Sequence, residues 1–164
     1  MRKEKKRMRA AAVFWWLLAA GWIYVLFYLS RQTAADSADL SGWFARGVLR
    51  RLSFLNVSER TFEFYMRKLA HFGIFAVEGF LVRTALFATK SRRGVNTLFA
   101  ILLCLPLAVT NELSELTALG RGCSAWDMGI DMAGAVLGIL VAALFAWIWE
   151  SFAIRRRYSQ MNRE

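Results

Sequence analysis

Histidine and proline each occur once in this 164-residue sequence, and cysteine occurs twice. A single histidine and the lack of any CxxC pair exclude the usual zinc-ligand spacings. Cys104 lies inside an apolar run and Cys123 in a polar stretch, so we expect no disulfide between them because their depths differ. One proline and 11 glycines exclude a long disordered linker. The sequence also lacks a P-loop, a dinucleotide-binding glycine fingerprint and a serine-histidine-aspartate arrangement.

The composition points to a membrane protein. Apolar residues make up 57% of the chain, charged residues 21%, and the formal net charge is +10. This apolar share is high for a soluble domain. A basic chain can bind nucleic acid, but here the charges flank apolar runs of membrane length. We therefore interpret them as topology signals and lipid contacts, and expect membrane lipids but no nucleic acid as partners.

Four apolar runs predict an all-α, polytopic membrane protein with four transmembrane helices. The predicted spans are Ala10–Leu29, Leu69–Ala88, Val95–Thr110 and Trp126–Trp149. The first is too long for a signal-peptide core and ends without a small-residue cleavage site, so we interpret it as an uncleaved span. The third is the shortest and lies near the lower limit of roughly 17 residues for crossing a bilayer.

Lysine and arginine predict the orientation. They cluster before the first span, in the turn after the second and after the fourth, whereas the long segment between the first two spans counts less. We therefore expect both termini to be cytoplasmic. The expected organisation is a basic cytoplasmic N-terminus (1–9), one membrane domain (10–149) and a basic cytoplasmic tail (150–164).

The segment between the first two spans contains a helical apolar stripe. Its members are Leu40, Trp43, Phe44, Gly47, Val48 and Leu52. Arg46 and Arg50 lie away from this stripe. The pattern predicts an amphipathic helix, which either lies on the outer leaflet or packs on the bundle with a solvated basic face.

Ionisable residues gather near the predicted outer ends of three spans. On the second span, Lys68, His71 and Glu78 lie on one helical face. Glu78 is about 15 Å below the outer boundary, where a carboxylate must be protonated, paired or hydrated. On the fourth span Asp127 and Asp131 lie on one face, and the same face continues with glycines that we interpret as packing positions.

The connection between the third and fourth spans adds further polar residues. Glu112 and Glu115 share a face if the third helix continues that far. Gly120 and Gly122 allow a tight turn that leaves Arg121 able to reach inward. These residues predict one charged pocket, for which three interpretations stay open: a structural ion-pair network, an acid–base catalytic site, and a site for a lipid phosphate or anionic glycan. One histidine and several carboxylates only weakly suggest a divalent metal.

These stretches resemble the VanZ-like family, bacterial membrane proteins named after a teicoplanin-resistance accessory protein. The matching motifs are Lys68-Leu-Ala-His71-Phe72, Asn111-Glu112-x-x-Glu115, Gly120-Arg121 and Asp127-x-x-x-Asp131-x-x-Gly134, with Ser30-Arg31-Gln32 after the first span. The chain departs from the family pattern at Phe75 (usually Tyr), Ile74 (often Glu), Asn111 (Asp) and Glu115 (Gln). The resemblance implies a multi-pass protein of the bacterial cytoplasmic membrane, linked in some members to reduced teicoplanin susceptibility.

We therefore expect an envelope protein whose polar site faces the outer leaflet and binds or modifies a lipid-linked or anionic component. The candidate proton-transfer residues are His71, Glu112 and Asp127. The candidate binding residues are Lys68, Arg121, Glu115, Asp131 and Glu78. The sequence predicts no metal site and identifies no cofactor, oligomeric state or reaction. The alternative is a non-enzymatic scaffold or partner subunit whose polar cluster is structural.

Overall fold

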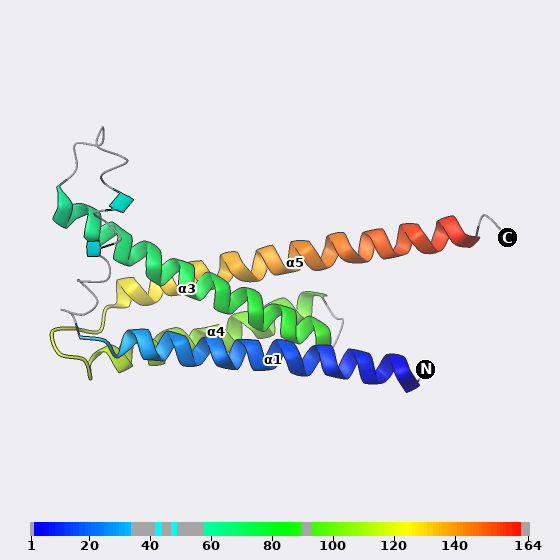
Figure 1. Cartoon of the computed structure of the whole chain (residues 1–164), viewed down its shortest axis with the longest axis horizontal. Coiled ribbons are helices and arrows are strands. Elements are labelled where there is room, and N and C mark those ends of the chain that lie inside the picture. The colour runs from blue at the N-terminus through cyan, green and yellow to red at the C-terminus, as the bar shows by residue number, and fades with distance from the viewer. Residues whose placement is uncertain (1, 34–41, 44–46, 49–57, 90–92, 162–164) are drawn as a thin grey trace.

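The computed structural model describes residues 2–33, 42–43, 47–48, 58–89 and 93–161, and this part of the chain contains four long helices. They are α1 (Arg2–Ser30), α3 (Glu59–Thr89), α4 (Arg93–Glu115) and α5 (Ala125–Met161). In Figure 1 the helices run roughly along the long axis of the molecule. The prediction of an all-helical protein with four spans is confirmed.

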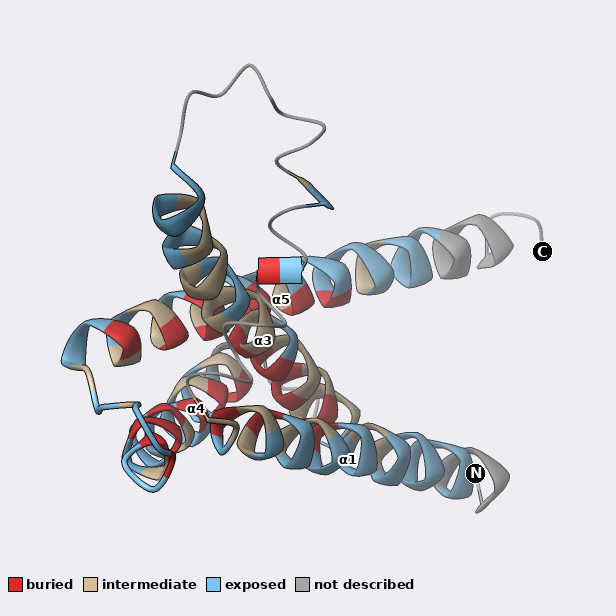
Figure 2. Cartoon of the chain, turned by 60° about the vertical axis from the view of Figure 1, so that its left-hand side comes forward, coloured by how far each residue is buried: buried red, intermediate tan, exposed pale blue. Residues whose placement is uncertain are grey.

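All four helices are long and apolar enough to cross a membrane. In the most apolar stretch of α1, only 11% is buried inside the protein, and the highest buried share among the four helices is 33%, in α3. Figure 2 shows that buried positions face the neighbouring helices, whereas the outer sides of α1 and α5 are largely exposed. Because these outward side chains are apolar, a hydrocarbon environment accounts for them and water does not.

The second spanning helix begins earlier than the apolar run suggested. Ser58 caps α3, since its hydroxyl accepts a hydrogen bond from the backbone N–H of Thr61 at 3.2 Å. His71 therefore lies several turns inside the helix, and not near its start. The apolar run predicted only the part of the helix expected in hydrocarbon, whereas the preceding polar turns also have helical geometry.

The third spanning helix is longer than predicted. α4 passes through Pro106 and continues beyond Thr110 to Glu115. Pro106 lacks a backbone N–H, so one hydrogen bond of the helix is missing. The hydroxyl of Thr110 donates to the carbonyl of Pro106 at 2.7 Å, which adds a local contact next to the break. The extension places Asn111, Glu112 and Glu115 on one continuous helix.

Glycines allow α3 and α5 to pack closely, and this pair forms the most extensive helix contact. A Cβ atom at Gly134 would collide with the carbonyl oxygen of Phe72, and one at Gly138 with that of Ala76. From the other side, a Cβ atom at Gly79 would collide with Ala135. The packing interpretation of the glycine stripe on the fourth span is confirmed.

Both chain ends lie at the same end of the bundle, as Figure 1 shows, and the connection between α4 and α5 lies at the opposite end. Cys104 is buried and Cys123 is exposed, and neither forms a disulfide. The predicted amphipathic helix lies outside the described residues, apart from the short helical pieces at 42–43 and 47–48. Apart from Glu78, the ionisable residues predicted as site residues gather at the end of the bundle away from the termini.

Candidate functional site

The predicted site residues come together between α3, α4, α5 and the loop that follows α4. The members linked by ion pairs or hydrogen bonds are Lys68, His71, Glu112, Glu115, Arg121, Asp127 and Asp131. The contacts among these residues span up to 60 positions in the chain. The structure therefore brings these seven residues together in one cluster, of which His71, Glu115 and Arg121 line a cavity, while their roles as site residues stay predictions.

Lys68 links α3 to the start of α5. Its ammonium group forms an ion pair with the carboxylate of Asp127, and both side chains are largely buried. Ser124 caps α5, because its hydroxyl accepts a hydrogen bond from the backbone N–H of Asp127 at 3.3 Å. The negative charge of Asp127 in the first helical turn also complements the helix dipole. This pair is thus both an ion pair and a helix-terminus interaction.

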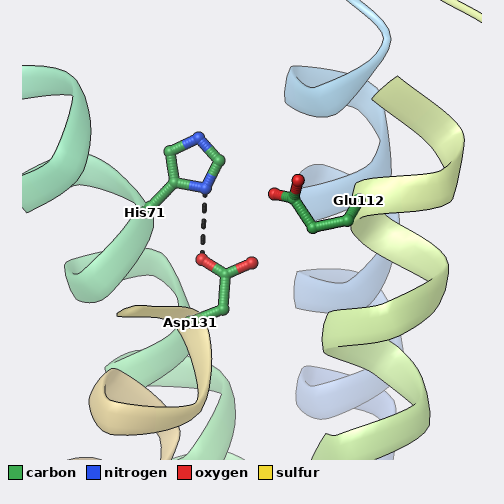
Figure 3. A group of neighbouring side chains, drawn as sticks. All are labelled: His71, Glu112 and Asp131. Atoms are coloured by element: carbon green, nitrogen blue, oxygen red, sulfur yellow. Dashed lines mark hydrogen bonds and ion pairs between the residues drawn. The ribbon is translucent and has the colours of Figure 1, made fainter. Parts of the chain in front are cut away.

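His71 lies between two carboxylates from different helices. Its Nδ1 is 3.1 Å from Oδ1 of Asp131, and its Nε2 is 3.7 Å from Oε1 of Glu115. Figure 3 shows the first of these contacts as a dashed line between α3 and α5. Asp131 is fully buried, so its charge has no access to bulk solvent. The imidazole is thus held in a geometry suited to donating or accepting a proton.

Arg121 reaches back into the bundle from the loop after α4. The turn before it contains Gly120 at a φ of 77°, a conformation that favours glycine. The Arg121 guanidinium donates to Glu115 at 2.8 Å and lies 3.4 Å from the backbone carbonyls of Leu29 and Ser30. It therefore connects α4 to the end of α1, as the tight turn and inward arginine in the sequence suggested.

Glu112 holds the start of α5 through the backbone. Its Oε2 accepts a hydrogen bond from the N–H of Ser124 at 2.9 Å. The whole side chain is buried, with 0% of its surface exposed, yet its Oε1 has no hydrogen-bond partner among the described residues. In Figure 3 the carboxylate points toward His71 and Asp131. Ligand atoms of these three residues all lie within 4.8 Å of one another, so this trio is the group that could hold a metal ion.

Two further polar residues belong to the cluster, and neither was among the predicted site residues. Ser30 hydrogen-bonds to Asn111, and the amide nitrogen of Asn111 lies 3.4 Å from Oδ2 of Asp131. Both side chains are buried. The sequence features that could have identified them are the Ser-x-Gln motif after the first span, which begins with Ser30, and the Asn111-Glu112 motif, which begins with Asn111.

A cavity of about 510 Å³ adjoins the cluster, between the end of α1, the first half of α3 and the end of α4. We call it the α1–α3 groove. Its apolar walls include Leu26, Leu29, Met66, Ile74 and Phe75, and its polar wall contains Ser30, Gln32, Arg67, His71, Asn111, Glu115 and Arg121. Leu69, at its edge, is 59% exposed, so the groove reaches the protein surface.

Arg67 differs from the other cations of the site. Its Nε is buried and has no hydrogen-bond partner among the described residues, whereas Lys68 and Arg121 are both paired with acids. Arg67 was not predicted as a site residue, because it lies beside the helical face that Lys68, His71 and Glu78 share. The groove wall extends beyond that face because α1 also contributes to it.

Glu78 is the predicted site residue that the structure does not bring to the cluster. It lies seven residues after His71 on α3, which corresponds to about 10 Å along the helix axis. Its side chain is fully buried, and within the described ranges neither carboxylate oxygen has a hydrogen-bond partner. It does not line the α1–α3 groove. Glu78 is thus an isolated carboxyl in the middle of the bundle.

Four apolar helices with a buried ionisable cluster at one end define a multi-pass membrane protein with an intramembrane polar site. The sequence model of the VanZ/LLP1 family matches residues 15–146, which include all the site residues. The protein therefore belongs to the VanZ/LLP1 family. No curated protein and no solved structure matches the chain.

Proposed function

We propose that this protein binds an anionic, lipid-linked component of the bacterial envelope in the α1–α3 groove. The observation that carries the proposal is the chemistry of the groove walls. Apolar side chains of α1 and α3 line the groove together with two arginines and the histidine. An amphiphile with an anionic headgroup and a hydrocarbon chain matches both kinds of lining.

Arg67 is the cation best placed to bind an incoming anion. A buried guanidinium nitrogen without a hydrogen-bond partner destabilises the protein, and a bound phosphate or carboxylate oxygen would remove this cost. Arg121 and Lys68, the cations expected from the sequence, already neutralise Glu115 and Asp127. A bound anion would therefore contact Arg67 first, with Arg121 contributing its remaining N–H groups.

The groove would face the outer leaflet of the cytoplasmic membrane. This orientation follows from the basic residues near both termini, which favour the cytoplasmic side. The cluster lies at the opposite end of the bundle from the termini. A site there would meet lipid-linked envelope components at the surface where glycopeptides act, which agrees with the link between this family and teicoplanin susceptibility.

The geometry supports binding more directly than a reaction. A chemical modification of the bound component would use His71 as acid or base, because this residue both lines the groove and contacts carboxylates. Glu115 and Asp131 are the carboxylates in contact with its imidazole, and Glu112 also points toward it, whereas Asp127 is paired with Lys68. A catalytic role for Asp127 would thus be indirect.

Lipid retention by the full-length protein tests the proposal. Native mass spectrometry would compare phosphatidylglycerol, which is anionic, with phosphatidylcholine, which is not. We expect Arg67→Ala to weaken phosphatidylglycerol retention about tenfold, the typical effect of losing a hydrogen bond to a charged group. Arg60→Ala, an exposed arginine on the same helix and outside the groove, is the matched control. Equal retention of both lipids, or no effect of Arg67→Ala, would reject the proposal.

A structural role for the cluster is the second candidate function, and the two ion pairs favour it. Lys68–Asp127 joins α3 to the start of α5 across 59 positions of the chain, and Arg121–Glu115 ties the loop after α4 to the end of that helix. In a scaffold or partner subunit, these pairs would serve only to hold the helices together. Such a protein would lose stability when a pair is broken but would show no preference for anionic lipid, so the lipid experiment separates the two candidates.

A further inference from the structure

Three helices each contribute one metal-ligating side chain to a common point. His71 comes from α3, Glu112 from α4 and Asp131 from α5, and one ligand atom of each lies within 4.8 Å of the others. Figure 3 shows the imidazole and the two carboxylates directed toward the space between them. All three residues are buried or half-buried. The chain has no other histidine, so only this point combines imidazole with carboxylates.

Glu112 provides an independent sign that a ligand belongs there. One of its oxygens accepts the backbone N–H of Ser124, while the other is buried without a hydrogen-bond partner in the described residues. An unpaired carboxylate oxygen in a dry interior is costly. The Glu112 carboxylate is directed toward His71 and Asp131, the point where a cation would bind.

The charges of the cluster lead to the same conclusion. Its four carboxylates outnumber the three permanent cations of the site, of which Arg67 lies in the groove wall, while Lys68 is engaged by Asp127 and Arg121 by Glu115. Glu112 and Asp131 have no such partner among the described residues. Protonation of His71 would supply only one positive charge. A divalent cation would balance both carboxylates.

We propose that His71, Glu112 and Asp131 bind a divalent transition-metal ion such as Zn²⁺ or Mn²⁺. One imidazole nitrogen and two carboxylate oxygens suit these ions, and three protein ligands leave a coordination position open. Ligand atoms around a tetrahedral Zn²⁺ lie about 3.4 Å apart, so the three side chains would close by roughly an ångström around the ion. The proposal does not depend on lipid binding in the groove.

Each proposed ligand is also held by an outer contact. Glu112 accepts the Ser124 N–H at 2.9 Å, and the amide of Asn111 lies 3.4 Å from Oδ2 of Asp131. Nε2 of His71 lies 3.7 Å from Glu115, so a metal bound at Nδ1 would leave an N–H directed at a carboxylate. A carboxylate behind a ligating histidine is a frequent arrangement in metal sites, because it orients the ring.

A proton is the competing occupant of this point. A positively charged imidazole between Asp131 and Glu115 would satisfy both contacts of His71 without any metal. That arrangement would leave the free oxygen of Glu112 unpaired unless this carboxyl is itself protonated. Direct measurement of metal binding distinguishes the two occupants.

The experiment uses the full-length protein, purified in detergent through an affinity tag without histidine and treated with a chelator. Isothermal titration with Zn²⁺ should give one site per chain. His71→Ala, Glu112→Gln and Asp131→Asn should each weaken it about 100-fold or more, since even outer-contact changes cost 10–100-fold. Glu78→Gln makes the same chemical change at a buried glutamate away from the cluster and should leave binding unchanged.

A measurement on the unchanged protein avoids reliance on variants that fail to fold. Because His71 is the only histidine, electron spin echo spectroscopy of bound Mn²⁺ or Cu²⁺ can assign an imidazole ¹⁴N signal to it without a substitution. We expect that signal at one metal equivalent. Absence of stoichiometric binding, binding without the ¹⁴N signal, or Zn²⁺ affinity unchanged in all three variants would each overturn the proposal.

Discussion

Nδ1 of His71 and Oδ1 of Asp131 lie 3.1 Å apart, although 60 positions separate the two residues in the chain. This contact joins α3 to α5, the two helices that pack most extensively. Glycines bring the helix backbones close together, which allows the short aspartate side chain to reach the imidazole. The same packing that holds the bundle together therefore sets the geometry of the polar site.

Breaking the Arg121–Glu115 pair should destabilise the protein. Both side chains are less than 10% exposed (8% and 5%), so Arg121→Ala leaves the buried Glu115 carboxylate with only its contact to His71 Nε2 at 3.7 Å. We expect a loss of about 3 kcal/mol in the free energy of unfolding, measured in detergent by denaturant titration. The double variant Arg121→Gln with Glu115→Gln should recover part of this loss, because no charge remains unpaired. A double variant less stable than Arg121→Ala would contradict the ion-pair account.

The glycine stripe gives a sharper test of helix packing. Gly138→Ala should lower the free energy of unfolding by about 1 to 3 kcal/mol, because the added methyl group meets the backbone of α3. Gly129→Ala is the matched control, since it lies on the same helix with no atom within 4 Å of the new methyl group. Thermal unfolding of both variants in detergent compares them. Similar stability of the two variants would mean that the close approach of α3 and α5 is wrong.

The two native cysteines test the proposed orientation without engineering. Cys123 is exposed in the loop between α4 and α5, and Cys104 is buried. A membrane-impermeant maleimide added to intact cells should label the protein, and Cys123→Ser should abolish the labelling. If labelling instead requires permeabilised cells, the loop and the cluster lie on the cytoplasmic side, and the proposed outer-leaflet site is wrong.

Much of the architecture could be predicted because lipid limits what a span can contain. Long apolar runs therefore revealed the four helices, and ionisable residues within them stood out. The helix boundaries were harder to predict. The first turns of α3, from Glu59 onward, and the extension of α4 past Thr110 contain many polar residues, so their composition does not distinguish them from loops.

Part of the site could not be predicted from sequence patterns. The hydrogen bond from the Ser124 backbone to Glu112 involves no side-chain motif at its donor end. The groove wall at Arg67 depends on where α1 lies relative to α3, and periodicity within one helix carries no such information. Glu78 is a prediction that failed in the opposite direction. It shares a helical face with His71 but does not belong to the cluster.

Photocrosslinking is the decisive test of whether an anionic lipid occupies the α1–α3 groove. Full-length protein in vesicles would be exposed to phosphatidylglycerol that carries a diazirine in its acyl chain, and modified residues would be mapped by mass spectrometry. We predict modification concentrated near Leu26 and Ile74, reduced by Arg67→Ala and by excess unmodified phosphatidylglycerol. Modification spread evenly over the outward face of α5, near Leu140 and Leu144, with no effect of either treatment, would contradict the account.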